Sequence, residues 1–433
     1  MFYDEEPHGV FVFIDTKSFY AGCEACQRGY NPLKVPLVVM SEQPNTNGGL
    51  VLATSPMAKK LFHLQANVSR QRALPDDPRL LVVPPRMNLY IQKNLAINQI
   101  FKRFVPEEML MPYSIDESLL SVKSSFRLFA KTPYEFARII QKTIKTELGL
   151  YMTVGIGETP IQAKLALDLF AKHNINLIGT LTYETVPSKI WPINKLTDIW
   201  SIGIRMEKRL HRLNIKSMGD LAHTNPYLLK KELGIMGLQL FALSWGVDRT
   251  EITQQIVVKN ASIGNSQVLP RDYQDQNEIE TVIKEIGEQV ASRLRAHKKV
   301  ASTISLSIGF SYAASETDGR SGFNIGLKIE PTNQQKVINN QLIFLFRKNW
   351  DGQSVRHISV YTSHLSQFKS LQLNLFDDPK RQVKGVQLAK VIDSIRQKYG
   401  FTKLVYANSL LAGGNAINRA NLVGGHNGGN AYE

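Results

Sequence analysis

Two acidic strings, about a hundred residues apart, constrain this chain more than any other feature. In the first, Asp15 directly follows the apolar run Val10–Ile14, and in the second Asp116 and Glu117 adjoin another apolar run. A carboxylate beside a buried strand is unfavourable unless a cation or hydrogen-bond donors accompany it. Three carboxylates brought together repel one another, and divalent cations relieve that repulsion. The sequence therefore predicts a fold that joins two distant strands at a metal-dependent active site.

The charge balance indicates the class of partner. The chain of 433 residues carries 52 basic and 37 acidic side chains, which gives a net charge of +15. A chain of this length has room for two to four domains. A positive excess of this size favours a polyanion such as nucleic acid over the alternative, a general role in solubility.

The cysteine content and the hydropathy pattern predict the compartment. Cys23 and Cys26 have the Cys-x-x-Cys spacing, but no second Cys/His cluster completes a zinc site. Core packing in a reducing compartment is the favoured interpretation over a redox pair. No apolar run approaches the ~20 residues that span a membrane, and no signal peptide precedes the first strand. We therefore expect a cytoplasmic protein without a membrane partner.

Strands and helices alternate over the first part of the chain. Hydrophobic periodicity predicts strands at 9–15, 37–40, 80–84 and 152–156, and helices at 17–28, 55–66, 87–104, 134–148 and 160–172. The loop from Ser41 to Gly49 is rich in turn-forming residues. This pattern is typical of an α/β arrangement with mixed connections.

The pattern changes in the second half. A helix–turn–helix is expected over 196–221. Later strands at 262–269, 303–312, 323–329 and 356–363 alternate with helices at 277–297 and 332–350. The order βαββαβ predicts a ferredoxin-like sandwich with one open sheet face. The Gly/Asn-rich stretch from Gly413 is predicted to lack stable structure.

A known family shares several of these strings. IDTKSFYAGCEA and YSIDES are followed in order by TVGIG, AKLA, IWSIG and LQLNLF. Together they resemble the Y-family of translesion DNA polymerases, most closely its UmuC branch, from about Val10 to Asp378. The resemblance implies an α+β multidomain right-hand polymerase with a ferredoxin-like palm, small fingers, a helical helix-hairpin-helix thumb and a βαββαβ little finger.

The resemblance also implies domain boundaries. The palm covers 9–28 and 82–175, the fingers 29–81, the thumb 176–250, a linker 251–260, the little finger 261–365 and a tail 366–433.

The family's catalytic centre maps onto the acidic strings. The resemblance implies that Asp15, Asp116 and Glu117 are catalytic, and that with the backbone carbonyl of Thr16 they hold two Mg²⁺ ions. Hard oxygen ligands suit this cation. Because neighbours in a regular strand face opposite ways, Asp116 and Glu117 can share one site only at a bend or a strand end.

The segment after Asp15 is the expected deoxynucleotide site. Ser18, Phe19 and Tyr20 begin a helix, with Ser18 as its expected cap, and free amides at a helix N-terminus attract anions. In the family the residue matching Tyr20 is the steric gate, whose ring excludes a 2′-hydroxyl. Taken alone, Tyr20 has the alternative interpretation of a core aromatic.

Two lysines are expected to bind the triphosphate. Lys172 matches the family lysine with this role, although its separation from Lys164 is one residue longer than in many relatives. Lys59 stands where many relatives have arginine, so it keeps the charge without the bidentate fork. Pro56 replaces a phosphate-contacting tyrosine of several relatives, and Thr54 and Ser55 are candidate substitutes.

The expected thumb contains a DNA-binding hairpin. Ser201, Ile202 and Gly203 resemble the turn of a helix-hairpin-helix, which binds phosphates through backbone amides. Relatives usually have glycine where this chain has Ser201. Arg205 and Lys208 follow and favour DNA over the alternative of an ordinary helical hairpin.

A peptide in the tail resembles the bacterial sliding-clamp binding motif. Its anchors are Gln372, Leu373, Leu375 and Phe376, and a few such side chains dominate binding to an apolar groove. The other partners that the resemblance implies are primer-template DNA, deoxynucleoside triphosphates, a RecA filament and a UmuD-like dimer.

The sequence thus predicts a lesion-bypass DNA polymerase of low fidelity, acting in DNA repair and SOS mutagenesis and associated with the nucleoid when active. Two alternatives stay open: a two-metal nuclease that uses the same carboxylates, and a catalytically inactive DNA-binding accessory protein.

Overall fold

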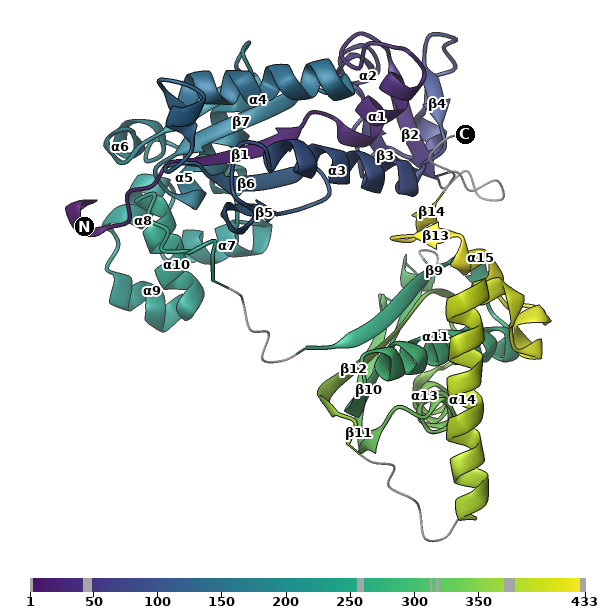
Figure 1. Cartoon of the computed structure of the whole chain (residues 1–433). Helices are drawn as coiled ribbons and strands as arrows, with labels where there is room; N and C mark the ends of the chain where they lie inside the picture. Colours follow the sequence, from purple (N-terminus) through teal and green to yellow (C-terminus); the bar gives the residue numbers. More distant parts are fainter. Residues whose placement is uncertain are drawn as a thin grey trace. The chain divides into compact units, whose positions relative to one another are not determined.

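The computed structural model describes residues 3–41, 49–254, 261–311, 314–316, 319–369 and 378–428. The described residues up to 254 form one compact unit, and those from 261 form a second (Figure 1). The clamp-peptide residues Gln372, Leu373, Leu375 and Phe376 lie outside the described residues, as do residues 42–48 of the predicted finger loop. The roles predicted for them remain predictions.

A five-stranded sheet brings the two acidic strings together. Its strands are β1 (Phe11–Thr16), β5 (Leu110–Pro112), β6 (Glu117–Ser121), β7 (Met152–Gly157) and β8 (Ile178–Leu181), in the order β5-β6-β1-β7-β8. Strand β1 is antiparallel to both β6 and β7. Three consecutive apolar residues of β1, Val12, Phe13 and Ile14, are almost completely buried, as expected of a central strand that is covered on both faces.

Helices cover this sheet. They include α1 (Phe19–Gln27), α3 (Met87–Phe101), α4 (Pro133–Leu148) and α5 (Pro160–Leu165). Helix α4 begins at a capping box in which Thr132 and Glu135 bond reciprocally, and it ends at Gly149 in the left-handed conformation. These local signals explain why the predicted range of α4 differs from the observed one by a single residue.

Close packing between β7 and the segment that starts with α5 depends on glycines in β7, as Gly155 illustrates. A Cβ atom at Gly155 would lie 2.0 Å from the Ala163 carbonyl oxygen and 2.4 Å from the Leu167 amide nitrogen. Only glycine allows the two backbones to approach this closely. Gly157, the second glycine of the TVGIG string, is equally close, since a Cβ atom there would lie 2.4 Å from the Ala163 amide nitrogen. The two glycines therefore set the distance between the sheet and the segment that carries Lys164.

Two smaller parts complete the first unit. One is a three-stranded sheet, β3-β2-β4, with β2 (Leu37–Ser41), β3 (Leu50–Thr54) and β4 (Leu81–Val83), next to α2 (Pro56–Phe62). The other is helical and consists of α6 (Val186–Lys189), α7 (Ile204–Arg212), α8 (Met218–His223), α9 (Pro226–Leu233) and α10 (Ile235–Ser244). Helices α7 to α10 share an apolar core with Ile199 and Ile202.

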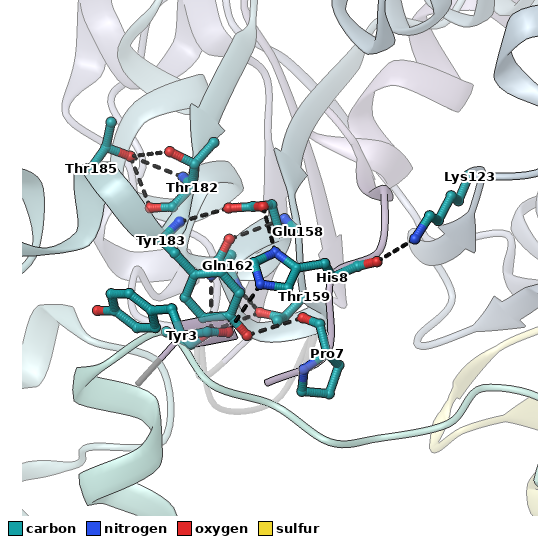
Figure 2. Close-up of polar contacts among 11 residues, drawn as sticks. Tyr3, Pro7, His8, Lys123, Glu158, Thr159, Gln162, Thr182, Tyr183 and Thr185 are labelled. Atoms are coloured by element: carbon teal, nitrogen blue, oxygen red, sulfur yellow. Dashed lines mark hydrogen bonds and ion pairs between the residues drawn. The ribbon is translucent and has the colours of Figure 1, made fainter. Parts of the chain in front are cut away.

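Hydrogen bonds join the N-terminal segment to Glu158, the residue that directly follows β7. Figure 2 shows the His8 ring between two acceptors: Nδ1 lies 3.0 Å from a Glu158 carboxylate oxygen and Nε2 lies 3.0 Å from the Tyr3 carbonyl oxygen. The other Glu158 oxygen accepts from the Tyr183 amide at 2.8 Å, and the Tyr183 hydroxyl donates to the Pro7 carbonyl. Both ring nitrogens can donate at once only in the charged imidazolium form.

This contact predicts a pH-dependent contribution to stability. The hydrogen bond to Glu158 raises the pKa of His8, and the Tyr3 carbonyl acts in the same direction. Since the folded-state pKa is raised, the contribution is complete below the unfolded value of about 6.5 and is lost as pH rises through the folded value. We expect His8→Gln to lower the free energy of unfolding at pH 5.5, by less than about 1 kcal/mol because the His8 ring is exposed to solvent.

The measurement is denaturant unfolding of wild type and His8→Gln at pH 5.5 and pH 8.5. The two proteins should differ at the lower pH and agree at the higher. A difference of equal size at both values would contradict the assignment of a charged ring.

The second unit has the order βαββαβ. Its elements are β9 (Ile263–Tyr273), α11 (Gln276–Ala296), β10 (Lys299–Phe310), β11 (Gly322–Thr332), α13 (Gln335–Asn349) and β12 (Val355–Gln367). The strand order is β11-β10-β12-β9, so each βαβ pair is split by a strand from the other. Helices α11 and α13 pack side by side against one face and share its core.

The prediction that the chain lacks stable structure from Gly413 is wrong for residues 413–428. Helix α14 (Pro379–Tyr399) lies against α11 (Figure 1), and α15 (Ala416–Ala420) and the hairpin β13 (Leu422–Val423) to β14 (His426–Asn427) follow it. Composition misled the prediction because the order comes from specific polar contacts: the Asn415 amide donates to Glu285, and Arg419 donates to Gln267 at 2.8 Å.

No helix among the described residues is both long enough and apolar enough to cross a membrane. Cys23 and Cys26 are both free thiols, and Cys23 is buried in the core, as the sequence predicts.

Candidate active site

The register of the first sheet places the acidic strings at one strand end. Asp15 and Glu117 are direct cross-strand partners in β1 and β6. A bend over Ser114–Asp116 precedes β6, and the Thr16 amide donates to the Asp116 carbonyl at 2.9 Å. The Ser114 hydroxyl donates to the Asp116 carboxylate at 2.7 Å and accepts from the Glu117 amide at 3.0 Å. Asp116 thus lies at a bend and Glu117 at a strand end, the local geometry in which adjacent carboxylates can share one site.

Two lysines neutralise these carboxylates in the structure. Lys164, which is buried, donates to Glu117 at 2.5 Å and lies 3.3 Å from Asp168. Lys172 lies 3.4 Å from Asp15 and 2.8 Å from Asp168. Asp168 therefore bridges the two lysines and is a fourth carboxylate of the site.

The electrostatics of the site indicate a need for cations. Burial raises the pKa of Asp15 to about 6; the Lys172 charge opposes the rise, and the carboxylates of Asp116 and Glu117 add to it. Burial on its own would lower the pKa of Lys172, but Asp15 and Asp168 outweigh it and raise the value. Negative charge is thus concentrated at the strand ends, which is the condition that favours binding of a divalent cation.

The donor set fits a hard divalent cation. Asp15, Asp116 and Glu117 offer carboxylate oxygens, the ligand type that Mg²⁺ prefers. Among the described ranges, no three His, Cys, Asp or Glu side chains are already gathered as a metal site. The Asp116 carboxylate accepts from the Ser114 hydroxyl, and the Glu117 carboxylate accepts from the Lys164 ammonium.

The helix predicted over 160–172 is interrupted at the functional position. Helix α5 ends at Leu165, a π-helical turn covers Ala166–Phe170, and a 3₁₀ turn covers Ala171–His173. A π turn accommodates one extra residue within a helix, and such turns recur at functional sites. With this turn in place, Lys172 lies 3.4 Å from Asp15.

The residues after Asp15 take up three different positions. Ser18 has φ 51° and makes no side-chain cap, so its predicted role as the helix cap is wrong; the left-handed backbone turns it away from that geometry. Phe19 is buried and packs in the core. Tyr20 is half-buried, and its ring stacks on that of Tyr90.

The other expected triphosphate residues differ in exposure. Lys59 is exposed on α2, whereas Ser55 is fully buried and caps that helix, which excludes Ser55 as a substitute phosphate contact. Thr54 is buried as well. Burial lowers the pKa of Lys17, and the nearby charges of Lys59 and Lys172 lower it further. Three lysines therefore share one region beside Asp15.

The hairpin before α7 contains a residue with a strained backbone. Ser201 adopts φ 76°, the left-handed region that glycine enters without strain. Ile202 is buried and its amide donates to the Ile199 carbonyl, so it packs in the core and cannot also offer that donor to a phosphate. Gly203, Arg205 and Lys208 are exposed.

Sequence reasoning missed several residues of this site. Lys164 and Asp168 have a helical i,i+4 spacing beside the AKLA string, which was an available signal. Glu24, which accepts from the Tyr90 hydroxyl, also had an available signal, because it is a carboxylate in a largely apolar helix. Tyr90, in contrast, is distant in sequence and carried no local signal.

Comparison with known proteins agrees with this arrangement. Residues 14–168 match the impB/mucB/samB family, and residues 260–375 match the C-terminal domain of that family. The chain is 40% identical to "Putative UV-damage repair protein UvrX" of Bacillus subtilis, covering 98% of this chain and 99% of that protein. It is 37% identical to "DNA polymerase IV 2" of Bacillus subtilis, covering 96% of this chain and 98% of that protein. The chain belongs to the impB/mucB/samB family, in the UmuC-like class of Y-family DNA polymerases.

A solved structure supports the same fold. A Y-family DNA polymerase chimera of Dbh and Dpo4 matches with a TM-score of 0.67 and 21% identity, covering 83% of this chain and 99% of that chain. The expected right-hand polymerase class is confirmed at the level of the fold. For this impB/mucB/samB family member, the sheet that carries Asp15 and Glu117 is the palm, and the βαββαβ unit is the little finger.

Proposed function

We propose that this Y-family polymerase performs lesion-bypass synthesis with low fidelity, using two Mg²⁺ ions, in DNA repair and SOS mutagenesis. The observation that carries the proposal is the pairing of Asp15 with Glu117 across β1 and β6, with Asp116 at the adjoining bend. Two Mg²⁺ ions, when bound, would activate the primer 3′-oxygen and stabilise the pyrophosphate leaving group.

The carboxylates and lysines have complementary roles in this proposal. Asp15, Asp116, Glu117 and the Thr16 carbonyl would hold the metal ions. Lys164 would leave Glu117 for Asp168, which already lies within 3.3 Å of it. That exchange frees the Glu117 oxygens without leaving a buried ammonium unpaired.

Positive charge would bind the triphosphate of the nucleotide, and the shape of the site would select its sugar. Lys172, Lys59 and the neighbouring Lys17 would bind the triphosphate as point charges. The start of α1, from Ser18 to Tyr20, would offer backbone amides to the same phosphates. Tyr20 would act as the steric gate and exclude a 2′-hydroxyl.

Further contacts would hold the DNA and the partners. Exposed Ser201, Gly203, Arg205 and Lys208 would contact backbone phosphates, with Ile202 as their buried anchor. The sequence of Gln372–Phe376 supports binding to a sliding clamp, which would offset low processivity. Action with a RecA filament and a UmuD-like dimer, at the nucleoid in the cytoplasm, rests on the family branch alone.

The test is primer extension by the purified full chain on a template with an abasic site. We expect Mg²⁺-dependent extension to and past the lesion, with frequent misincorporation on undamaged template. No extension even with clamp and RecA filament would refute the proposal. Mg²⁺-dependent degradation of the DNA without deoxynucleotides would support the nuclease alternative instead.

A further inference from the structure

The ring of Tyr20 rests on a second aromatic ring, that of Tyr90. The centroids of Tyr20 and Tyr90 lie 4.3 Å apart, with 13° between the ring planes. Tyr90 comes from α3 and is fully buried, whereas Tyr20 is only half-buried. One face of the Tyr20 ring is therefore covered by a side chain that has no access to solvent.

A buried charge network fixes Tyr90 in place. Its hydroxyl donates to a Glu24 carboxylate oxygen at 2.8 Å. Arg86 donates to both oxygens of the same carboxylate, at 3.0 and 2.6 Å, and Arg28 binds it as well. Glu24 is fully buried, and the fixed fork of Arg86 sets its orientation. Tyr90 is thus held at both its ring and its hydroxyl.

We propose that Tyr90 is a positioning residue that sets sugar selectivity by holding the Tyr20 ring. The inference rests on the proposed role of Tyr20 as the steric gate. A half-buried side chain with one face free could leave its rotamer and open space for a 2′-hydroxyl. Stacking on an immobile partner opposes that movement. An aromatic pair of this kind shifts an equilibrium by about two- to tenfold.

The test compares Tyr90→Leu with Tyr90→Phe in the full chain. Single-nucleotide insertion gives kcat/KM for a deoxynucleotide and for the matching ribonucleotide, and their ratio is the discrimination. The ratio does not depend on how much of each protein is active. We expect Tyr90→Leu to lower it about two- to tenfold, through faster ribonucleotide insertion. Tyr90→Phe, which keeps the ring, should retain most of the discrimination although it loses the bond to Glu24.

A double variant separates positioning from a general structural effect. In the Tyr20→Ala background no gate is left to position, so adding Tyr90→Leu should change the ratio no further. Equal losses in Tyr90→Leu and Tyr90→Phe, or an unchanged ratio in Tyr90→Leu, would overturn the inference. Should Tyr90→Leu fail to fold, Tyr90→Met removes the ring with an unbranched side chain that adapts to irregular space in a core, and it has the same expected result.

The Tyr20→Ala variant separates a failure of the positioning role of Tyr90 from a failure of the gate role of Tyr20. If Tyr20→Ala lowers discrimination and Tyr90→Leu does not, only the positioning role fails. If Tyr20→Ala itself leaves discrimination unchanged, the gate assignment fails, and the role of Tyr90 fails with it.

Discussion

Asp116→Asn should lower the rate of primer extension by at least about a thousandfold. Metal-assisted stabilisation of the transition state is worth several kcal/mol, and each 1.36 kcal/mol is about tenfold in rate. Asparagine keeps an oxygen that can accept the Ser114 hydroxyl, so the bend before β6 should persist. The measurement is single-turnover insertion at saturating Mg²⁺.

Glu147→Gln is the matched control for this loss. Glu147 is an exposed carboxylate paired with Arg103 at 2.6 Å, and exposed ion pairs contribute little to stability. Its rate should equal that of wild type. Near-normal extension by Asp116→Asn, with an unchanged melting temperature, would remove Asp116 from the catalytic centre.

Glu24→Ala should lower the free energy of unfolding of the first unit by about 3–5 kcal/mol, because it leaves a buried guanidinium without its partner. For a unit of this size the melting temperature should fall by roughly 6–20 °C. Arg86 is the residue left unpaired, since its two bonds to Glu24 make the ion pair bidentate and both side chains are buried. Calorimetry of the full chain gives the measurement.

A double variant and the pH dependence check the cause of this effect. Adding Arg86→Met to Glu24→Ala should restore part of the loss, because the uncompensated charge is then gone. Burial alone would raise the pKa of Glu24, but bonds from Arg86, Arg28 and Tyr90 outweigh it and lower the value. The contribution is therefore present above the unfolded value of about 4.3 and is lost as pH falls through the folded one. Additive losses in the double variant would contradict the ion-pair explanation.

Much of the fold could be predicted from local signals. Periodicity, caps and the alternation in β10 and β11 indicated the element types, and the predicted range of α4 differs from the observed one by a single residue. The ordered segment from α14 to β14 could not be predicted in this way. Its order depends on long-range contacts, such as Arg295 to Asp393 at 2.6 Å, that no periodicity encodes.

The candidate site likewise contains residues that local sequence signals indicated and residues that they did not. Asp15, Asp116 and Glu117 stood out because carboxylates beside apolar runs need a physical reason. Tyr90 did not, because its relation to Tyr20 exists only after α1 and α3 pack together. The conformation of Ser18 was also hidden, since serine before a helix ordinarily indicates a cap rather than a left-handed turn.

The π turn over Ala166–Phe170 also limits which exchanges with relatives this protein should tolerate. Each residue of an α-helix adds about 100° of rotation. A segment that is one residue shorter therefore presents its last lysine in the same direction only if it is regularly helical and lacks the π turn. A graft that replaces residues 164–172 as a whole would bring the helical rotation that suits its own length. A graft that joins half of each segment within the turn would rotate Lys172 out of line with Asp15. Crossover points for hybrid polymerases therefore belong outside this segment.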